Sequence, residues 1–370
     1  MDYPESKNGG RMMRNPMRWG AVMMVALLFA LGVSTAADEK TAQKTKKKSG
    51  DEKSTEKTPT QTDVITSIPF AETNGKRPYN ASGVAEIGDG RFLFCDNKIR
   101  NALIEFHLDE QGKMAGQFIR RPLAGVDASA VDDLEGMTIV ERNGDRFVVA
   151  TSSFERNHTQ KGKKMVPAEG YAGGLLRVRP GTEKTLKAEN IPGFREWLIS
   201  KYPELKASAD LVPDDAGLNI EGLAWDPNRG ALLFGLRTPL INGKPTILPV
   251  RLKGEGGQWR LEEFEALPAI SLQVQTAGNQ GIRSLAYAPK LKAFVVSLGK
   301  ATSIVKAPFS IVLWDGGDQG TVRTFEHLRF ARGVKIEGLA GATIGGKRSL
   351  LLIDDAGGYS VIPEDDPRLR

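Results

Sequence analysis

Three glutamates occupy the same place in a recurring local sequence, each between an apolar residue and a glycine. Glu135, Glu221 and Glu337 take this position in DLEGMTIV, NIEGLAWD and KIEGLAGA. A carboxylate in an apolar run is costly to bury unless it has a partner. Convergent carboxylates can hold a hard cation such as Ca²⁺, or they can raise one another's pKa and act as general acid and base. Either chemistry requires a fold that brings the three together.

The motif belongs to a longer repeat in which other residues also take the glutamate position. Ser82 and Arg283 stand there in the remaining copies, so that five copies follow one another at spacings of 53, 86, 62 and 54 residues. Each copy is followed by a turn and an apolar, strand-like run, and further strand-like segments come next. Four strands per unit, repeated about every 50 residues, are typical of a β-propeller. The sequence therefore predicts an all-β propeller with five four-stranded blades, or six because the second spacing is long.

Two parts of the chain depart from the regular repeat. The fifth copy shows only three strands, and we expect the segment DVITSIPF, residues 63–70, to supply its outer strand and close the ring. The long second spacing contains a polar, basic insertion that starts at Phe154 and an amphipathic segment that starts at Pro192. The second of these predicts one inserted helix. Both insertions are expected to be excursions from the second blade.

The propeller geometry predicts which residues meet at one mouth of the central channel. Each innermost strand begins on the face where its antiparallel neighbour ends, so the motif position and the residue about 16 positions later share that mouth. The predicted set is Ser82, Glu135, Glu221, Arg283 and Glu337, together with Asp96 or Lys98, Ser152, Arg237, Lys300 and Asp354. This set is almost entirely polar, which explains why a glutamate interrupts an apolar run.

The mouth residues suggest three roles. The candidate acid/base groups are Glu135, Glu221, Glu337 and Asp354. The candidate ligands for Ca²⁺ or another divalent cation are Glu135, Glu221 and Glu337. The candidate binding groups for a small or anionic ligand are Arg237, Arg283, Lys300 and Ser152. The structural alternative is that each glutamate caps backbone N–H groups or pairs with Arg237, Arg283 or Lys300.

Composition argues against several other classes. The formal net charge is +6, but the basic residues are scattered and no zinc-finger, RRM or KH signature is present, so no nucleic-acid partner is expected. The single cysteine, Cys95, cannot form an intrachain disulfide and has no base near it in sequence. No two of the three histidines are close in sequence, which disfavours a histidine-rich zinc site. A triad of Ser153, His158 and Asp354 lacks a nucleophile elbow.

The N-terminus predicts export. Three arginines precede a 14-residue apolar run, residues 20–33, and small residues follow it. That run is shorter than the ~18–20 residues needed to span a bilayer. We therefore expect a signal peptide (1–37), a disordered lysine-rich linker (38–63) and a propeller domain (64–370), in a periplasmic or secreted monomer without a stable membrane span. The alternative is an uncleaved, marginal membrane anchor.

The motifs also resemble a known family. DLEGMTIV, ATSSFERNHTQKGK, NIEGLAWDPNRGALLFGLRTPLINGKP and IEGLAGATIGGKRSLLLIDDAG resemble the uncharacterised bacterial domain-of-unknown-function family number 3616, over most of residues 80–360. The glutamate–glycine motifs also look like those of phytase-like esterase and gluconolactonase-like propellers. In the latter, a glutamate followed by glycine is a metal ligand, which implies that role for Glu135, Glu221 and Glu337. Ser82 and Arg283 depart from that pattern.

Two functions are compatible with these observations. The first is a metal-assisted or acid/base hydrolase of phosphoesters, esters or lactones. The second is a non-catalytic propeller that binds a ligand, a protein or an envelope glycan. Convergent carboxylates or a bound ion would favour the enzyme, whereas glutamates that are each locked to backbone would favour the scaffold.

Overall fold

The computed structural model describes residues 64–70, 80–127, 130–254, 259–276, 279–325 and 327–369. The chain divides into two units, and all of these residues belong to the second, residues 57–370. The predicted signal peptide and linker lie outside the described residues. Within the described ranges, no helix has both the length and the apolar composition that a membrane crossing requires.

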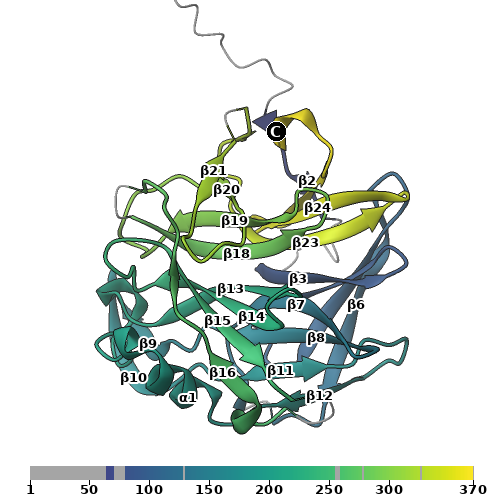
Figure 1. Cartoon of the computed structure of the whole chain (residues 1–370). Coiled ribbons are helices and arrows are strands. Elements are labelled where there is room, and N and C mark those ends of the chain that lie inside the picture. The colour runs from purple at the N-terminus through teal and green to yellow at the C-terminus, as the bar shows by residue number, and fades with distance from the viewer. Residues whose placement is uncertain are drawn as a thin grey trace, which may run out of the picture. The chain divides into compact units, whose positions relative to one another are not determined.

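Five strands, one from each copy of the repeat, pack against one another in a ring. They are β3 (Ala81–Gly88), β7 (Leu134–Arg142), β13 (Asn219–Asp226), β18 (Gln280–Ala288) and β23 (Ile336–Ile344). Along the ring β3 contacts β7, β7 contacts β13, β13 contacts β18, β18 contacts β23, and β23 contacts β3 again. Figure 1 shows these inner strands side by side.

Each inner strand continues into a sheet of antiparallel strands. The second strands are β4 (Arg91–Asp96), β8 (Asp145–Ser152), β14 (Ala231–Thr238), β19 (Ala293–Lys300) and β24 (Lys347–Asp354). The third strands are β5 (Ala102–Leu108), β11 (Leu175–Val178), β15 (Thr246–Leu252), β20 (Ser310–Trp314) and β25 (Gly358–Pro363). The outer strands are β6 (Met114–Ala124), β12 (Leu186–Asn190), β16 (Phe264–Ala266), β21 (Val322–Thr324) and β2 (Ile68–Pro69). The outer strands β6 and β12 pair in parallel, which joins the first two sheets into one of eight strands.

The N-terminal segment supplies the outer strand of the last sheet, as the sequence predicted. β2 pairs antiparallel with β25, which also carries Tyr359. The ring of Phe70 stacks on that of Tyr359 with centroids 5.3 Å apart. The Tyr359 hydroxyl accepts a hydrogen bond from the backbone N–H of Met114 at 2.9 Å. The start and the end of the described chain are thus held together through the last and the first sheets.

The long second spacing contains the predicted helix and also a hairpin that was not predicted. Helix α1 (Phe194–Lys201) buries Phe194 and Leu198. The polar, basic insertion forms a two-stranded sheet of β9 (Arg156–Lys161) and β10 (Lys164–Tyr171). The shorter elements are β1 (Val64–Ile65), which pairs with β22 (Arg329–Phe330), β17 (Ile270–Ser271), η3 (Pro203–Leu205), η4 (Pro213–Asp215), η5 (Leu261–Glu263) and η6 (Pro367–Leu369).

The buried apolar side chains form five clusters, one between each pair of neighbouring sheets. Alternation along the strands produces this arrangement. In β14, Leu232 and Phe234 pack toward the second sheet, whereas Leu233 packs toward the fourth. The inner strands of each repeat are therefore packed on both sides, and the fold is an all-β propeller.

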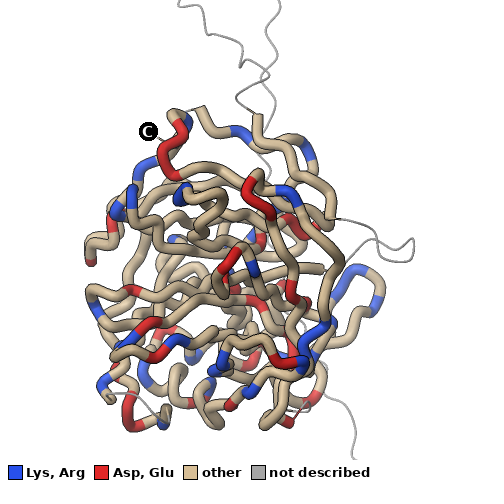
Figure 2. Tube along the Cα trace, turned by 90° about the vertical axis from the view of Figure 1, so that its right-hand side faces the viewer, with Lys and Arg blue, Asp and Glu red and all other residues tan. Residues whose placement is uncertain are grey.

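The charged residues do not gather by sign on the side that Figure 2 shows. Lys and Arg positions are interspersed with Asp and Glu positions along the trace. The prediction that no nucleic acid binds stays a prediction.

Candidate functional site

The motif residue of each inner strand is an unpaired residue in a β-bulge. In β13, Ile220 pairs with Leu236 and Gly222 pairs with Gly235, so Glu221 has no partner on β14. The same irregularity falls at Glu135 in β7, Arg283 in β18 and Glu337 in β23, and at Ser82–Gly83 in β3. A bulge redirects the extra side chain out of the regular alternation. The repeat therefore turns one residue per sheet away from the packed faces.

The glycine that follows the motif residue is required for packing, because the next inner strand approaches it closely. A Cβ on Gly338 would lie 2.2 Å from the carbonyl oxygen of Ser82. A Cβ on Gly222 would lie 2.8 Å from Cγ2 of Ile282. In the fourth sheet Ser284 takes this position, and its hydroxyl accepts a hydrogen bond from the N–H of Leu339 at 3.0 Å. The glycine is thus needed for packing, whereas the residue before it supplies a polar side chain.

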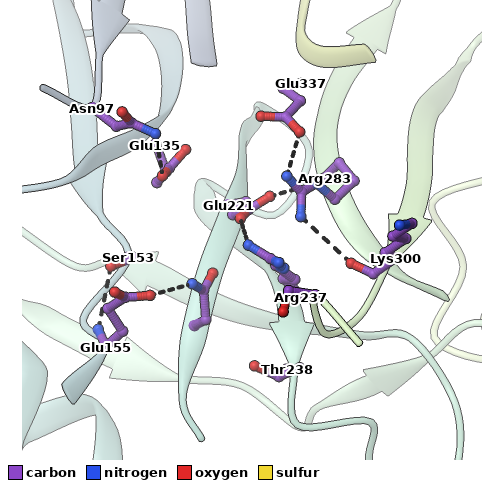
Figure 3. Close-up of polar contacts among 12 residues, drawn as sticks. Asn97, Glu135, Ser153, Glu155, Glu221, Arg237, Thr238, Arg283, Lys300 and Glu337 are labelled. Atoms are coloured by element: carbon purple, nitrogen blue, oxygen red, sulfur yellow. Dashed lines mark hydrogen bonds and ion pairs between the residues drawn. The ribbon is translucent and has the colours of Figure 1, made fainter. Parts of the chain in front are cut away.

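Two arginines bind two of the three glutamates. Arg283 Nε lies 2.7 Å from Glu221 Oε2, and Arg283 Nη2 contacts Glu337 Oε1. Arg237 Nη1 donates to Glu221 Oε1 at 2.8 Å. Figure 3 shows Glu221 between the two guanidinium groups, with Glu337 beside Arg283. The predicted pairing with arginine is confirmed for Glu221 and Glu337.

Burial makes these ion pairs structurally important. The exposed fraction of Glu221 is 2% and that of Arg283 is 6%. Burial by itself would lower the pKa of Arg283, but the neighbouring Glu221, Glu337 and Glu135 outweigh it and raise that pKa. Burial raises the pKa of Glu337 to about 7, with Arg283 opposing the rise and Glu221 adding to it.

Glu135 differs from Glu221 and Glu337 because it forms no ion pair with any residue that the structure describes. Its Oε1 accepts a hydrogen bond from Asn97 Nδ2 at 3.4 Å. Within the described ranges, no Lys, Arg or His nitrogen forms an ion pair with Glu135. Burial raises the pKa of Glu135 well above its usual range, and the carboxylates of Asp133, Glu221 and Glu337 raise it further. The neutral acid therefore persists to a higher pH at Glu135 than it does in an exposed glutamate.

Two further carboxylates extend the cluster, and the predicted site did not include them. Glu155 Oε2 accepts a hydrogen bond from Asn219 Nδ2 at 2.7 Å, and its Oε1 lies 3.3 Å from His158 Nδ1. Burial and then Asp133 raise the pKa of Glu155 to about 8. Burial also raises the pKa of Asp133, and Glu221 adds to that rise.

The backbone around these two carboxylates is strained. Asp133 has φ 51° and Phe154 has φ 58°, values that residues other than glycine rarely adopt. Strained residues of this kind cluster at functional sites. Strand alternation gives no signal for Asp133, because its left-handed backbone precedes the extended β7 and Glu135 lies in a bulge.

Two other predicted residues, Asp354 and Ser152, bind backbone groups, and a third, Lys300, is exposed. The Asp354 carboxylate accepts hydrogen bonds from the N–H groups of Lys335 at 3.1 Å and Ala356 at 2.9 Å, which caps a turn. The buried Ser152 hydroxyl donates to the carbonyl of Gly173 at 2.6 Å. Lys300 is exposed, and its carbonyl accepts from Arg283 Nη1 at 3.5 Å. The structure thus gathers Glu135, Glu221, Glu337, Arg237 and Arg283, and it assigns backbone contacts to Asp354 and Ser152.

The carboxylates as they lie do not fit a divalent cation. The guanidinium of Arg283 contacts both Glu221 and Glu337, so a fixed positive charge already lies between two of the three predicted ligands. In the part of the chain that the structure describes, no group of three or more His, Cys, Asp or Glu side chains is arranged to hold a metal ion. Calcium binding stays a prediction.

A pocket of about 390 Å³ opens at the other end of the inner strands. Its lining includes Glu86, Arg146, Trp225, Tyr287 and Arg348. None of the predicted mouth residues lines it. The glutamate cluster and this pocket are therefore separate features of the channel.

The fold and the carboxylate–arginine cluster define the class of protein, a β-propeller with a polar site at one end of its channel. Residues 118–327 match the family described as "Protein of unknown function (DUF3616)", and the chain belongs to that family. No curated protein matches the sequence. The resemblance to phytase-like propellers stays a prediction.

Solved structures with low similarity were also found. One titled "glucose dehydrogenase" is 13% identical with a TM-score of 0.39, covering 77% of this chain and 97% of that one. A mutant of the GH43 protein BlXynB from Bacillus licheniformis is 12% identical with a TM-score of 0.40, covering 74% of this chain and 48% of that one. A streptogramin B lyase is 13% identical with a TM-score of 0.33, covering 78% of this chain and 95% of that one. At these values the likenesses carry no argument about activity.

Proposed function

We propose that the protein is an acid/base hydrolase of ester-type bonds, with its working groups at the glutamate end of the channel. The observation that carries the proposal is Glu135, a buried carboxyl with a raised pKa and no cationic partner among the described residues. It lies near a second carboxyl, Glu337, whose pKa is about 7. Titratable groups whose environments differ in this way are the usual basis for assigning an acid and a base.

The two carboxyl groups would take complementary roles. Glu337 is suited to be the general base, since a catalytic pKa near the working pH is the most effective. It would remove a proton from a water molecule as that water attacks the carbonyl carbon or the phosphorus. Glu135 would donate its proton to the leaving oxygen as the ester bond breaks, which gives an acid and an alcohol. Exchange with solvent would restore both groups.

The arginines would orient these groups and the substrate. Arg283 fixes Glu337, and Glu221 fixes Arg283 in turn. Arg237 is partly exposed, at 18% of its side chain, and is the cation best placed to meet an anionic group on a substrate. Lys300 is a second, more exposed candidate. We expect a substrate that carries a carboxylate or phosphate close to the bond that is cleaved.

The test is turnover of p-nitrophenyl acetate, bis-p-nitrophenyl phosphate and a δ-lactone by the wild type and by Glu135→Gln. Removal of a general acid lowers the rate by about 100-fold or more, with the larger effect expected on kcat. Glu141→Gln is the matched control, since Glu141 lies on the same strand but 67% of its side chain is exposed. Turnover that Glu135→Gln leaves unchanged, or no turnover of any of the three substrates, would oppose the proposal.

A second candidate is a non-catalytic binding propeller of the cell envelope. It is favoured by the ion pairs of Glu221 and Glu337 and by the 390 Å³ pocket at the opposite end of the channel. On this account Glu135→Gln changes no reaction, and ligands are held at the other mouth. Export to the periplasm or medium as a monomer remains part of both proposals, and cell fractionation with gel filtration tests it.

A further inference from the structure

A second pocket, of about 310 Å³, lies outside the glutamate cluster. It is bounded by the start of α1 and by the end of β10, and its lining includes Phe154, Tyr171, Asn190, Arg195 and Glu196. Figure 1 shows α1 next to the hairpin of β9 and β10. The pocket falls within the size range of small-molecule sites, about 300–1,000 Å³.

Arg195 is the charged group of this pocket, and three contacts fix its orientation. Its Nε donates to the carbonyl of Phe154 at 2.9 Å, and its Nη2 donates to the carbonyl of Ala209 at 2.5 Å. Its guanidinium carbon lies 3.6 Å from the centroid of the Tyr171 ring. A guanidinium held in one plane in this way is preorganised to bind an anion, because less side-chain entropy is lost on binding.

The charge of Arg195 is poorly neutralised. The exposed fraction of Arg195 is only 7%, and burial lowers its pKa. Its single ion pair among the described residues joins Nη1 to Glu196 Oε1 at 3.5 Å, and 66% of the Glu196 side chain is exposed. Solvent around the exposed Glu196 carboxylate weakens this long contact, so it neutralises Arg195 only in part. Asp210 is the other nearby carboxylate, and it accepts its hydrogen bond from the Tyr171 hydroxyl at 2.6 Å.

The N-terminus of α1 also favours an anion in this pocket, but it contributes less than Arg195. The N-cap residue of α1 is Gly193, which has no side chain to cap the first N–H groups of the helix. Uncapped N–H groups at a helix N-terminus favour an anion nearby. The cavity and the buried Arg195 carry the inference, and the helix end only reinforces it.

We propose that this pocket binds the carboxylate or phosphate group of a small ligand through the Nη1 edge of Arg195. The anion displaces Glu196, which takes that edge when the pocket holds no ligand. The pocket lining includes no residue of the glutamate cluster and binding there requires no reaction, so the inference goes beyond the proposed hydrolase. Both carboxylate and phosphate present oxygen pairs that a guanidinium binds in two-point geometry.

The experiment is isothermal titration of the full chain with sodium acetate and with inorganic phosphate, at constant ionic strength set with chloride. We expect saturable binding of at least one anion to the wild type. Glu196→Gln removes the competing carboxylate and should tighten binding by about two- to fivefold. Arg195→Lys keeps the charge but loses the two-point geometry and should weaken binding by about tenfold or more. Lys201→Gln, which removes an exposed charge at the other end of α1, should change nothing.

Acetate and phosphate titrations distinguish the two ligand chemistries. Binding of acetate alone assigns a carboxylate ligand, and binding of phosphate alone assigns a phosphate ligand. Failure of both anions to bind the wild type overturns the proposal, whether or not Arg195→Lys folds. Equal affinity of the wild type and Glu196→Gln also overturns it, because Glu196 would then not occupy the binding edge. A purely structural clamp at Arg195 predicts that result.

Discussion

Replacement of Glu135 by glutamine should make the protein increasingly more stable than the wild type as the pH rises. The pKa of the Glu135 carboxyl is raised well above its ordinary value of 4.5, first by burial and then by neighbouring carboxylates. The folded state therefore holds a proton that the unfolded state has released, throughout the pH range between the two pKa values. In that range the wild type loses stability as the pH rises, since the folded state binds more protons. Glutamine resembles the protonated acid in shape and does not titrate.

The magnitude follows from proton linkage. One extra proton bound by the folded state changes the free energy of unfolding by about 1.4 kcal/mol per pH unit. The difference between Glu135→Gln and the wild type should therefore be near zero below pH 4.5 and should grow by about 1.4 kcal/mol per unit above it. The growth stops at the folded-state pKa. No cation pairs with Glu135 among the described residues, so the exchange breaks no ion pair to offset the gain.

Urea unfolding at about pH 5, 6 and 7 measures this difference, with the free energy extrapolated to water. Glu141→Gln on the same strand is the control, because most of the Glu141 side chain is exposed. A constant difference between Glu135→Gln and the wild type over the three pH values would refute the reasoning. It would mean that Glu135 is already ionised in the folded protein.

Three further outcomes are expected. Glu221→Gln should lower the free energy of unfolding by about 3 kcal/mol in urea, since it leaves the buried Arg283 and the partly exposed Arg237 short of a carboxylate. A loss below about 1 kcal/mol would contradict the ion-pair account. Gly338→Ala should destabilise by about 2 kcal/mol or more, because its Cβ would lie 2.2 Å from the Ser82 carbonyl oxygen, whereas Gly173→Ala should cost less than half as much because its nearest neighbour is 3.7 Å away. Calcium should leave the melting temperature unchanged, as Arg283 lies between two candidate ligands; a calcium-dependent rise that Glu337→Gln abolishes would restore the metal hypothesis.

The ring of strands could be predicted because short-range sequence patterns mark each copy of the repeat. Glycine or serine after the motif residue marks the place where neighbouring inner strands meet, as Gly338 and Ser284 show. Alternating apolar residues mark the faces that pack against adjacent sheets. These features depend only on neighbours in sequence and on the repeat. The position of the motif residues, and their meeting at one mouth of the channel, could therefore be predicted from the sequence.

The chemistry of the mouth could not be predicted to the same depth. Whether Arg283 neutralises a glutamate depends on side-chain directions set by bulges in two different sheets. Asp354 and Ser152 lie at the predicted strand ends. The side chain of each forms a hydrogen bond with a nearby backbone group, and the repeat does not specify that bond. Glu155 enters the cluster because the chain turns sharply at Phe154, which has φ 58°. Nothing in the spacing of the motifs signals that turn.

The most direct test of the account is the protonation state of Glu135. Difference infrared spectra of the wild type and Glu135→Gln, recorded from about pH 5 to 9, isolate the C=O stretch of a protonated carboxyl that belongs to this side chain. We predict that this band is present in the wild type at neutral pH and absent from the variant. Its absence from the wild type at neutral pH would show an ionised Glu135, and the acid that the proposed hydrolase requires would not exist.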